Sequence, residues 1–176
     1  FDSEIRAYLP PRSTMGVLLQ MDQLLRDAKP TPKTSIAKQL HDVALMMKRR
    51  SFVIVLSDFL SEADDVLAGL EHLRFAGHNV MVLHTLDPHE LEFPFEGTWQ
   101  FDGLEGEEPL ITQPERIKED YLANLNEYLT TFQDGCVASQ IDYALVDTSR
   151  PLDVFLNEFF HQRESRLNGS AGRAGA

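Results

Sequence analysis

The chain has 176 residues, a length typical of one globular domain. Hydrophobic residues make up 43% and charged residues 25%, which excludes a wholly disordered or collagen-like chain. The formal net charge is -12, so the average surface repels a phosphate backbone, and we expect no nucleic-acid partner. The apolar runs are too short for a membrane helix, which needs about 20 residues, so no membrane span is expected.

The chain has one cysteine, Cys136, which excludes an internal disulfide and a thiolate zinc cluster. A reducing cytoplasm is therefore the expected location. Cys136 follows Asp134 and Gly135 at an expected helix end, where a structural thiol is favoured over a nucleophile. The first residues have neither an initiator Met nor the features of a signal peptide, so the start is expected to be cut.

The first third of the chain predicts one strand and two helices. Apolar residues alternate with polar ones over residues 1–9, which indicates a half-buried strand ended by Pro10 and Pro11. A helix is predicted from about residue 13 to residue 28. Residues 34–50 follow the helical period closely and predict an amphipathic helix.

The middle of the chain has the pattern of a βαβ unit. The unbroken apolar run 52–56 is typical of a strand covered on both faces in a parallel sheet. Residues 61–64 have the form of a capping box that opens a helix, and Gly77 ends it. A further strand is predicted over residues 80–83. This order of elements makes the predicted fold class α/β.

Residues 88–113 interrupt this pattern with prolines and two turn signals, and we interpret them as an inserted β-hairpin. Thr112 and Glu115 have the spacing of a capping box for a long helix that Gly135 ends. A last strand is predicted over residues 141–146.

A closing helix is predicted to begin at Pro151, with Phe155 and Phe159 on its apolar side. The residues after Leu167 cannot form a core. We therefore expect one partial domain over residues 1–167 and a disordered tail over residues 168–176.

Oxygen-bearing side chains follow the predicted strands at three places: Ser57 with Asp58, Thr85 with Asp87, and Asp147 with Thr148 and Ser149. In an open α/β sheet these positions converge at one edge, where ligands bind. Carboxylates and hydroxyls are the hard ligands that Mg²⁺, Ca²⁺ or Mn²⁺ prefer. The alternative is that each residue caps the helix that follows it, and these residues alone favour that alternative.

Other motifs of enzyme chemistry are missing from the sequence. The six histidines are scattered without a metal-ligand pattern, and His84, inside a predicted strand, is interpreted as a hydrogen-bonded packing residue. No glycine-rich phosphate loop and no Gly-x-Ser-x-Gly elbow is present. We therefore expect a protein that is not an enzyme.

Several segments resemble the bacterial domain-of-unknown-function family 58. They are residues 5–12, 34–40, 49–59 and 86–91, and the segment Leu56 to Phe59 is the most specific of them. The similarity covers nearly the whole chain to about Phe160.

That resemblance implies a von Willebrand factor type A-like fold, a doubly wound and mostly parallel sheet with a metal-ion-dependent adhesion site. By resemblance Thr34 matches the second segment of that site and Asp58 the third. The first segment, Asp-x-Ser-x-Ser, does not occur in the sequence, which is therefore expected to be the C-terminal part of a longer protein. Binding of Mg²⁺ or another divalent cation is expected to be weak or absent in this chain.

Truncation of that fold would leave unpaired strand edges and apolar surface. We therefore expect residues 1–12 either to detach from the sheet or to pair with another chain. A homo-oligomer formed through exposed strand edges is the corresponding prediction.

Three functions follow as hypotheses. The first is a non-enzymatic interaction module with an incomplete metal site, whose protein partner the resemblance implies to be a MoxR-type AAA+ ATPase in assembly or chaperone work. The second is a metal-dependent hydrolase that uses Asp58, Asp87 and Asp147 around an ion. The third is a purely structural fragment in which Asp58 only caps a helix.

Overall fold

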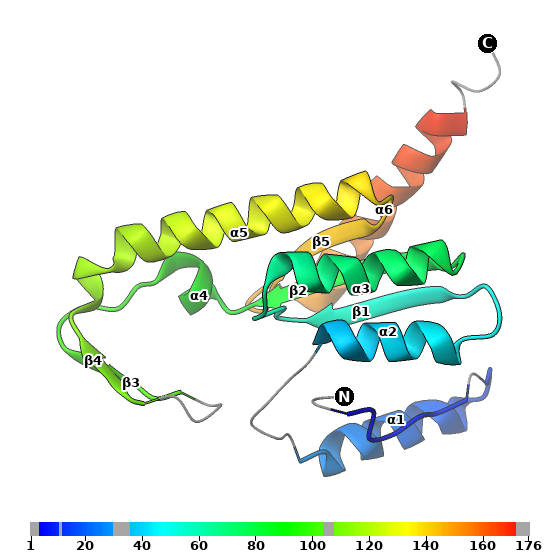
Figure 1. The fold of residues 1–176 in the computed structure, drawn as a ribbon, viewed down its shortest axis with the longest axis horizontal. Helices are drawn as coiled ribbons and strands as arrows, with labels where there is room; N and C mark the ends of the chain where they lie inside the picture. Colours follow the sequence, from blue (N-terminus) through cyan, green and yellow to red (C-terminus); the bar gives the residue numbers. More distant parts are fainter. Residues whose placement is uncertain (1–3, 11, 30–35, 104–107, 172–176) are drawn as a thin grey trace.

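The computed structural model describes residues 4–10, 12–29, 36–103 and 108–171, and the side chains as far as residue 164. In this part of the chain, three parallel strands form one sheet in the order β1-β2-β5 (Figure 1). The strands are β1 (Phe52–Ser57), β2 (Asn79–Leu86) and β5 (Asp142–Asp147). The α/β class is confirmed, and so is the parallel βαβ unit.

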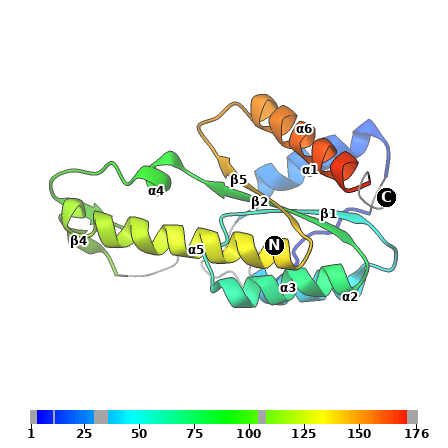
Figure 2. The same cartoon turned by 90° about the horizontal axis from the view of Figure 1, so that it is seen from above.

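Helices lie on both faces of this sheet (Figure 2). On one face are α2 (Ile36–Met46), α3 (Ala63–Phe75) and α5 (Lys118–Ala138), and on the other is α6 (Leu152–Ala171). Alternate residues of β2 explain this arrangement, because Val80 and Val82 face the first group while Met81 and Leu83 face α6. A strand in the middle of the sheet is therefore buried on both sides.

The larger core lies between the sheet and the helices α2, α3 and α5. The fully buried side chains there include Val66, Leu70, Leu73 and Phe132. Helix α2 packs closely on α3, and Gly69 lets the two helices approach each other. A Cβ at Gly69 would lie 3.0 Å from the Leu40 Cβ and 3.1 Å from the Ala37 carbonyl oxygen.

The second core is small and leaves most of β1 uncovered on the α6 side. Phe155 and Phe159 of α6 pack on Met81 and Leu83 of β2. The β1 side chains that alternate with the buried Val55 are exposed: Phe52 by 46%, Ile54 by 44% and Leu56 by 64%. The expectation that this strand is covered on both faces is therefore wrong. Among the described residues β1 is an edge strand, and α6 packs on β2 and β5 and reaches β1 through Arg163, whose guanidinium lies 5.2 Å from the centroid of the Phe52 ring.

The predicted N-terminal strand is also wrong for the residues described. Residues 4–10 form no strand, and residues 1–3 lie outside the described part of the chain. The following helix α1 (Met15–Asp27) is confirmed, but it has no buried residue. An alternating pattern gives no strand here because the structure provides no partner strand for it.

Two predicted capping boxes do not form. Helix α3 begins after Glu62, whose side chain makes no capping hydrogen bond, and Asp64 and Asp65 place negative charge in its first turn instead. Pro114 begins a 3-10 turn, η1 (Pro114–Arg116), and α5 follows it. The Glu115 carboxylate accepts a hydrogen bond from the Gly97 amide, 2.6 Å away, so it does not cap α5.

A β-hairpin forms in residues 88–113, as predicted. Strands β3 (Trp99–Phe101) and β4 (Leu110–Thr112) pair antiparallel, and residues 104–107 of the connecting loop lie outside the described part of the chain. A short helix that was not predicted, α4 (Pro88–Glu92), precedes the hairpin.

Two predicted helix ends also differ from the structure. Helix α5 continues through Gly135 to Ala138. Helix α6 continues through residues 168–171, the first part of the expected tail, while residues 172–176 lie outside the described part. None of the helices described has the length and apolar character required to cross a membrane.

Gly69→Ala is expected to lower the free energy of unfolding by about 1–2 kcal/mol, because the new methyl group has to separate α2 from α3. Urea unfolding followed by circular dichroism measures the change. Gly16→Ala is the matched control, since no atom lies within 4 Å of a Cβ there. Gly16→Ala should not destabilise, since alanine is the better helix former; equal losses for both variants would contradict close packing at Gly69.

Candidate functional site

The loop that follows β1 holds Asp58 at the carboxyl edge of the sheet. Phe59, the next residue, is 1% exposed and has a φ of 48°, which a phenylalanine rarely adopts. The Ser57 hydroxyl oxygen accepts a hydrogen bond from the Phe59 amide, and the Phe59 carbonyl accepts one from the Ser61 amide. This tight turn buries the ring of Phe59 and leaves the Asp58 carboxylate exposed.

His84 lies beneath this loop, near the end of β2, and is 1% exposed. Its Nδ1 is 3.1 Å from the Tyr143 hydroxyl of β5. The rings of Phe59 and Phe132 lie edge-on to the imidazole at centroid distances of 5.2 and 5.7 Å. The interpretation of His84 as a hydrogen-bonded packing residue is confirmed.

The environment of His84 favours the neutral imidazole. Burial lowers its pKa from 6.5, while a hydrogen bond with the Asp58 backbone and the charge of the Asp58 carboxylate oppose this shift. Burial also raises the pKa of Tyr143. Both groups of this pair are therefore uncharged near neutral pH, which suits an apolar core.

A second tyrosine fixes the loop from α5. The Tyr128 hydroxyl donates a short hydrogen bond to the Phe59 carbonyl. Burial, together with the nearby charge of Asp58, raises the pKa of Tyr128 to about 12. The hydroxyl therefore keeps its proton and remains a donor to the strained loop.

Cys136 belongs to this same core and is fully buried. Burial raises the pKa of its thiol to about 12, so the nucleophilic thiolate does not form at neutral pH. Cys136 is a packing residue, as the sequence predicts.

Asp87 and Asp147 are the other predicted site residues at this edge. Asp87 is the N-cap of α4: its carboxylate accepts from the His89 amide, and Glu90 completes the capping box. The Asp147 carboxylate accepts from the amide and the hydroxyl of Ser149 at 2.8 and 2.7 Å. These hydrogen bonds lower the pKa of each carboxyl group.

The structure brings Asp87 and Asp147 together. Leu86 of β2 is in register with Asp147 of β5. The negative charge of Asp87 raises the pKa of Asp147 and so offsets part of the lowering by Ser149. Thr148 bridges them, because its amide donates to the Leu86 carbonyl and its side chain interacts with Asp87. Thr85 lies inside the longer strand β2 instead of following it.

The residues described do not form a complete metal site. Within the described ranges, no group of three or more His, Cys, Asp or Glu side chains is placed to hold a metal ion. At the β1 loop, Asp58 has the Ser57 hydroxyl within 3.4 Å, whereas a divalent cation takes about six oxygen ligands. Thr34, the other predicted ligand, lies outside the described residues, so its role stays a prediction.

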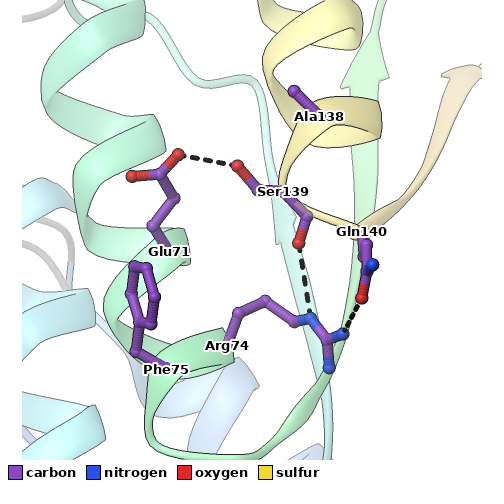
Figure 3. A pocket seen from close by; sticks show the side chains of 6 residues that line it. All are labelled: Glu71, Arg74, Phe75, Ala138, Ser139 and Gln140. Atoms are coloured by element: carbon purple, nitrogen blue, oxygen red, sulfur yellow. Dashed lines mark hydrogen bonds between the residues drawn. The ribbon is translucent and has the colours of Figure 1, made fainter.

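The opposite edge of the sheet has a cavity of about 420 Å³ between α3 and the turn after α5 (Figure 3). The Arg74 guanidinium donates to the carbonyls of His78 and Ser139 and to the Gln140 side chain. The Ser139 hydroxyl donates to Glu71. These polar groups bond to one another, and the bonds join α3 to the turn at the end of α5.

Sequence reasoning missed Tyr128 and Tyr143 as supports of the Asp58 loop. Tyr128 lies on the apolar side of α5, and a histidine inside an apolar strand requires a hydrogen-bond partner. The requirement was visible in the sequence, but the identity of the partner depends on the pairing of β2 with β5.

The family described as "Protein of unknown function DUF58" matches residues 1–128. The chain belongs to the DUF58 family. No curated protein and no solved structure matched the chain. The matched part of this DUF58 chain includes Asp58, His84 and Tyr128, whereas Tyr143, Asp147 and α6 follow it.

The buried histidine of this DUF58 chain predicts a loss of stability in acid. Because burial lowers the folded-state pKa of His84, only the unfolded chain takes up this proton between the folded pKa and 6.5. The free energy of unfolding should therefore fall as the pH drops below 6.5, by up to about 1.4 kcal/mol per pH unit from this group. Urea unfolding of wild type and His84→Phe at several pH values tests this; an equal slope in both would contradict it.

Tyr128→Phe is expected to lower the free energy of unfolding by about 1 kcal/mol, because the Phe59 carbonyl loses one hydrogen bond. The matched control is Tyr121→Phe, whose hydroxyl makes no hydrogen bond with the residues described. Hydrogen exchange should show faster opening of the β1 loop in Tyr128→Phe alone. Identical exchange in both variants would show that Tyr128 does not hold the loop.

Proposed function

We propose that this DUF58 chain is a non-enzymatic protein-interaction module whose contact surface is the carboxyl edge of the sheet around Asp58. One observation carries the proposal: the exposed Asp58 carboxylate lies on a turn that Tyr128 and His84, both beneath it, hold through Phe59. A rigid turn loses little conformational freedom on binding, so its carboxylate can be offered to a partner or to a shared cation at low entropic cost.

A von Willebrand factor type A-like architecture agrees with this proposal. Three features support it: the parallel strands, the helices on both faces, and the position of Asp58 directly after a strand. In that arrangement a divalent cation at the edge is held partly by Thr34 and Asp58 and partly by a carboxylate of the partner. The incomplete ligand set favours a cation that binds together with the partner.

The alternative, a metal-dependent hydrolase, has less support. It would need Asp58, Asp87 and Asp147 around one ion. However, one carboxylate oxygen of Asp87 and one of Asp147 already accept a hydrogen bond from a backbone amide of their own turn. The buried thiol of Cys136, with its raised pKa, offers no nucleophile. In the β1 loop the Ser57 hydroxyl has only a long contact of 3.4 Å with the Asp58 carboxylate, and its oxygen accepts a hydrogen bond from the Phe59 amide, which is a structural arrangement rather than that of an activated nucleophile.

The partner that the family resemblance suggests is a MoxR-type AAA+ ATPase, and the net charge of -12 agrees with a protein partner rather than a nucleic acid. Such a partner would approach the carboxyl edge of the sheet and contribute an acidic side chain to the shared cation. We propose an assembly or chaperone role for the complex.

Asp58→Ala is expected to weaken binding of a MoxR-type ATPase by at least about tenfold in the presence of Mg²⁺, since it removes a ligand that the partner cannot replace. Calorimetric titration of the ATPase into wild type, Asp58→Ala and Thr34→Val measures this, with Asp134→Ala on α5 as the exposed control. EDTA should reduce wild-type binding to the level of Asp58→Ala.

Binding that is unchanged in Asp58→Ala would rule out the carboxylate as a contact. Turnover of a generic phosphate or carboxylate ester, abolished by Asp58→Ala, would establish the hydrolase instead. Magnesium titration of the protein alone should give weak binding at most, because the described residues around Asp58 are too few.

A further inference from the structure

The β3–β4 hairpin has a small aromatic core of its own. It stands off from the sheet where β2 leads into α4 (Figure 1). Phe93 stacks on Tyr121 of α5 at a centroid distance of 4.5 Å, and Phe95 packs against Phe101 at 5.3 Å and Trp99 at 5.0 Å. Isolated two-stranded hairpins are marginal in water, so this cluster is what fixes the hairpin to α5.

The hairpin presents apolar side chains that nothing in the described chain covers. Trp99 and Phe101 face the aromatic core, and Ile111 lies on the opposite face because neighbouring residues of a strand alternate. Ile111 is 67% exposed, whereas Leu110, the cross-strand partner of Phe101, lies on the face of the aromatic core and is 55% exposed. Within the described residues the hairpin has only two strands, so each strand also has an unpaired backbone edge.

The surroundings of the hairpin are strongly acidic. Among the described residues between positions 87 and 120, Asp and Glu outnumber Lys and Arg by nine to two. Glu96 and Asp102 flank β3, and Glu108 precedes β4. The ion pairs found among the described residues do not neutralise any of these three with a lysine or arginine.

We propose that this hairpin is a docking surface for a basic, extended segment of another protein, in which lysine or arginine alternates with aliphatic residues. Such a segment can add to an unpaired strand edge, place its aliphatic side chains on the face that carries Ile111, and direct its cations to the flanking carboxylates. A second copy of this chain, a nucleic acid and an anionic membrane all carry the wrong charge for this surface. The contact goes beyond the proposed function, because it requires neither Asp58 nor a cation.

The probe is a short monomeric peptide that alternates lysine with leucine, titrated into the whole chain in the presence of EDTA. Trp99 reports the contact directly, since it is the one tryptophan of the chain and lies in β3. Its emission should shift on binding. A peptide that alternates lysine with serine, and one that alternates glutamate with leucine, should bind at least about tenfold more weakly.

Two variants test the two parts of the contact. Ile111→Thr keeps a β-branched residue in the strand and should weaken binding about tenfold, as about 1.4 kcal/mol of lost contact would do. Glu108→Lys should weaken binding by a similar factor. The controls are Val137→Thr and Asp134→Lys, two exposed positions near the end of α5, whereas the aromatic core of the hairpin contacts this helix at Tyr121, near its start.

Unchanged circular dichroism and unchanged Trp99 emission before titration verify that each variant keeps the hairpin. Equal binding of the lysine–serine peptide would overturn the apolar part of the proposal, and equal binding by Ile111→Thr or Glu108→Lys would overturn the site. Self-association in sedimentation that Ile111→Thr abolishes would show that the surface serves a second copy instead. Asp58→Ala should bind the peptide as wild type does, so failure of the proposed function and failure of this inference are distinguishable.

Discussion

A buried imidazole near the end of the central strand is the constraint on which the carboxyl edge of the sheet depends. His84 cannot be left without a partner in an apolar core, and the Tyr143 hydroxyl of the neighbouring strand provides one. The rings of Phe59 and Phe132 then close around it, which requires the chain after β1 to turn back sharply at Phe59. The exposed position of Asp58 is a consequence of this buried packing. The strained backbone of Phe59 is tolerated because several independent contacts hold this turn in place.

The sequence contains enough information for the parallel strands, most of the helices and the hairpin, because each has a distinct period or turn signal. Prediction failed where an element depends on its neighbours. The alternating pattern of residues 1–9 has no partner strand among the residues described, and the apolar run of β1 says nothing about which face α6 covers. The Asp58 loop could be located from the sequence, but its supports on α5 and β5 come from tertiary packing.

Local hydrogen bonds decided between competing roles for the acidic residues. Asp87 and Asp147 were candidates for a metal site, but each forms the short-range bonds of a cap or turn. Asp58 differs from them, because its turn is stabilised chiefly by the Ser57 hydroxyl and by Tyr128 from another element. Its carboxylate is held at one oxygen only by weak contacts, 3.4 Å from the Ser57 hydroxyl and 3.5 Å from the Leu60 amide. That difference is the reason for placing the contact surface at Asp58.

The two ends of the sheet have different chemistry. At the amino end, Arg74 of α3 donates two hydrogen bonds to the turn after α5, at Ser139 and Gln140, and a third to the His78 carbonyl before β2 (Figure 3). This end therefore resists change in the spacing of α3 and α5. At the carboxyl end, Asp58 and the acidic hairpin are both exposed, and α5 connects the two because it supports the loop through Tyr128 and the hairpin through Tyr121. Tyr121 and Tyr128 are two turns apart on one helix, which fixes the geometry between them. A partner that contacts both sites would therefore meet a rigid frame, and its second contact would cost less entropy than its first.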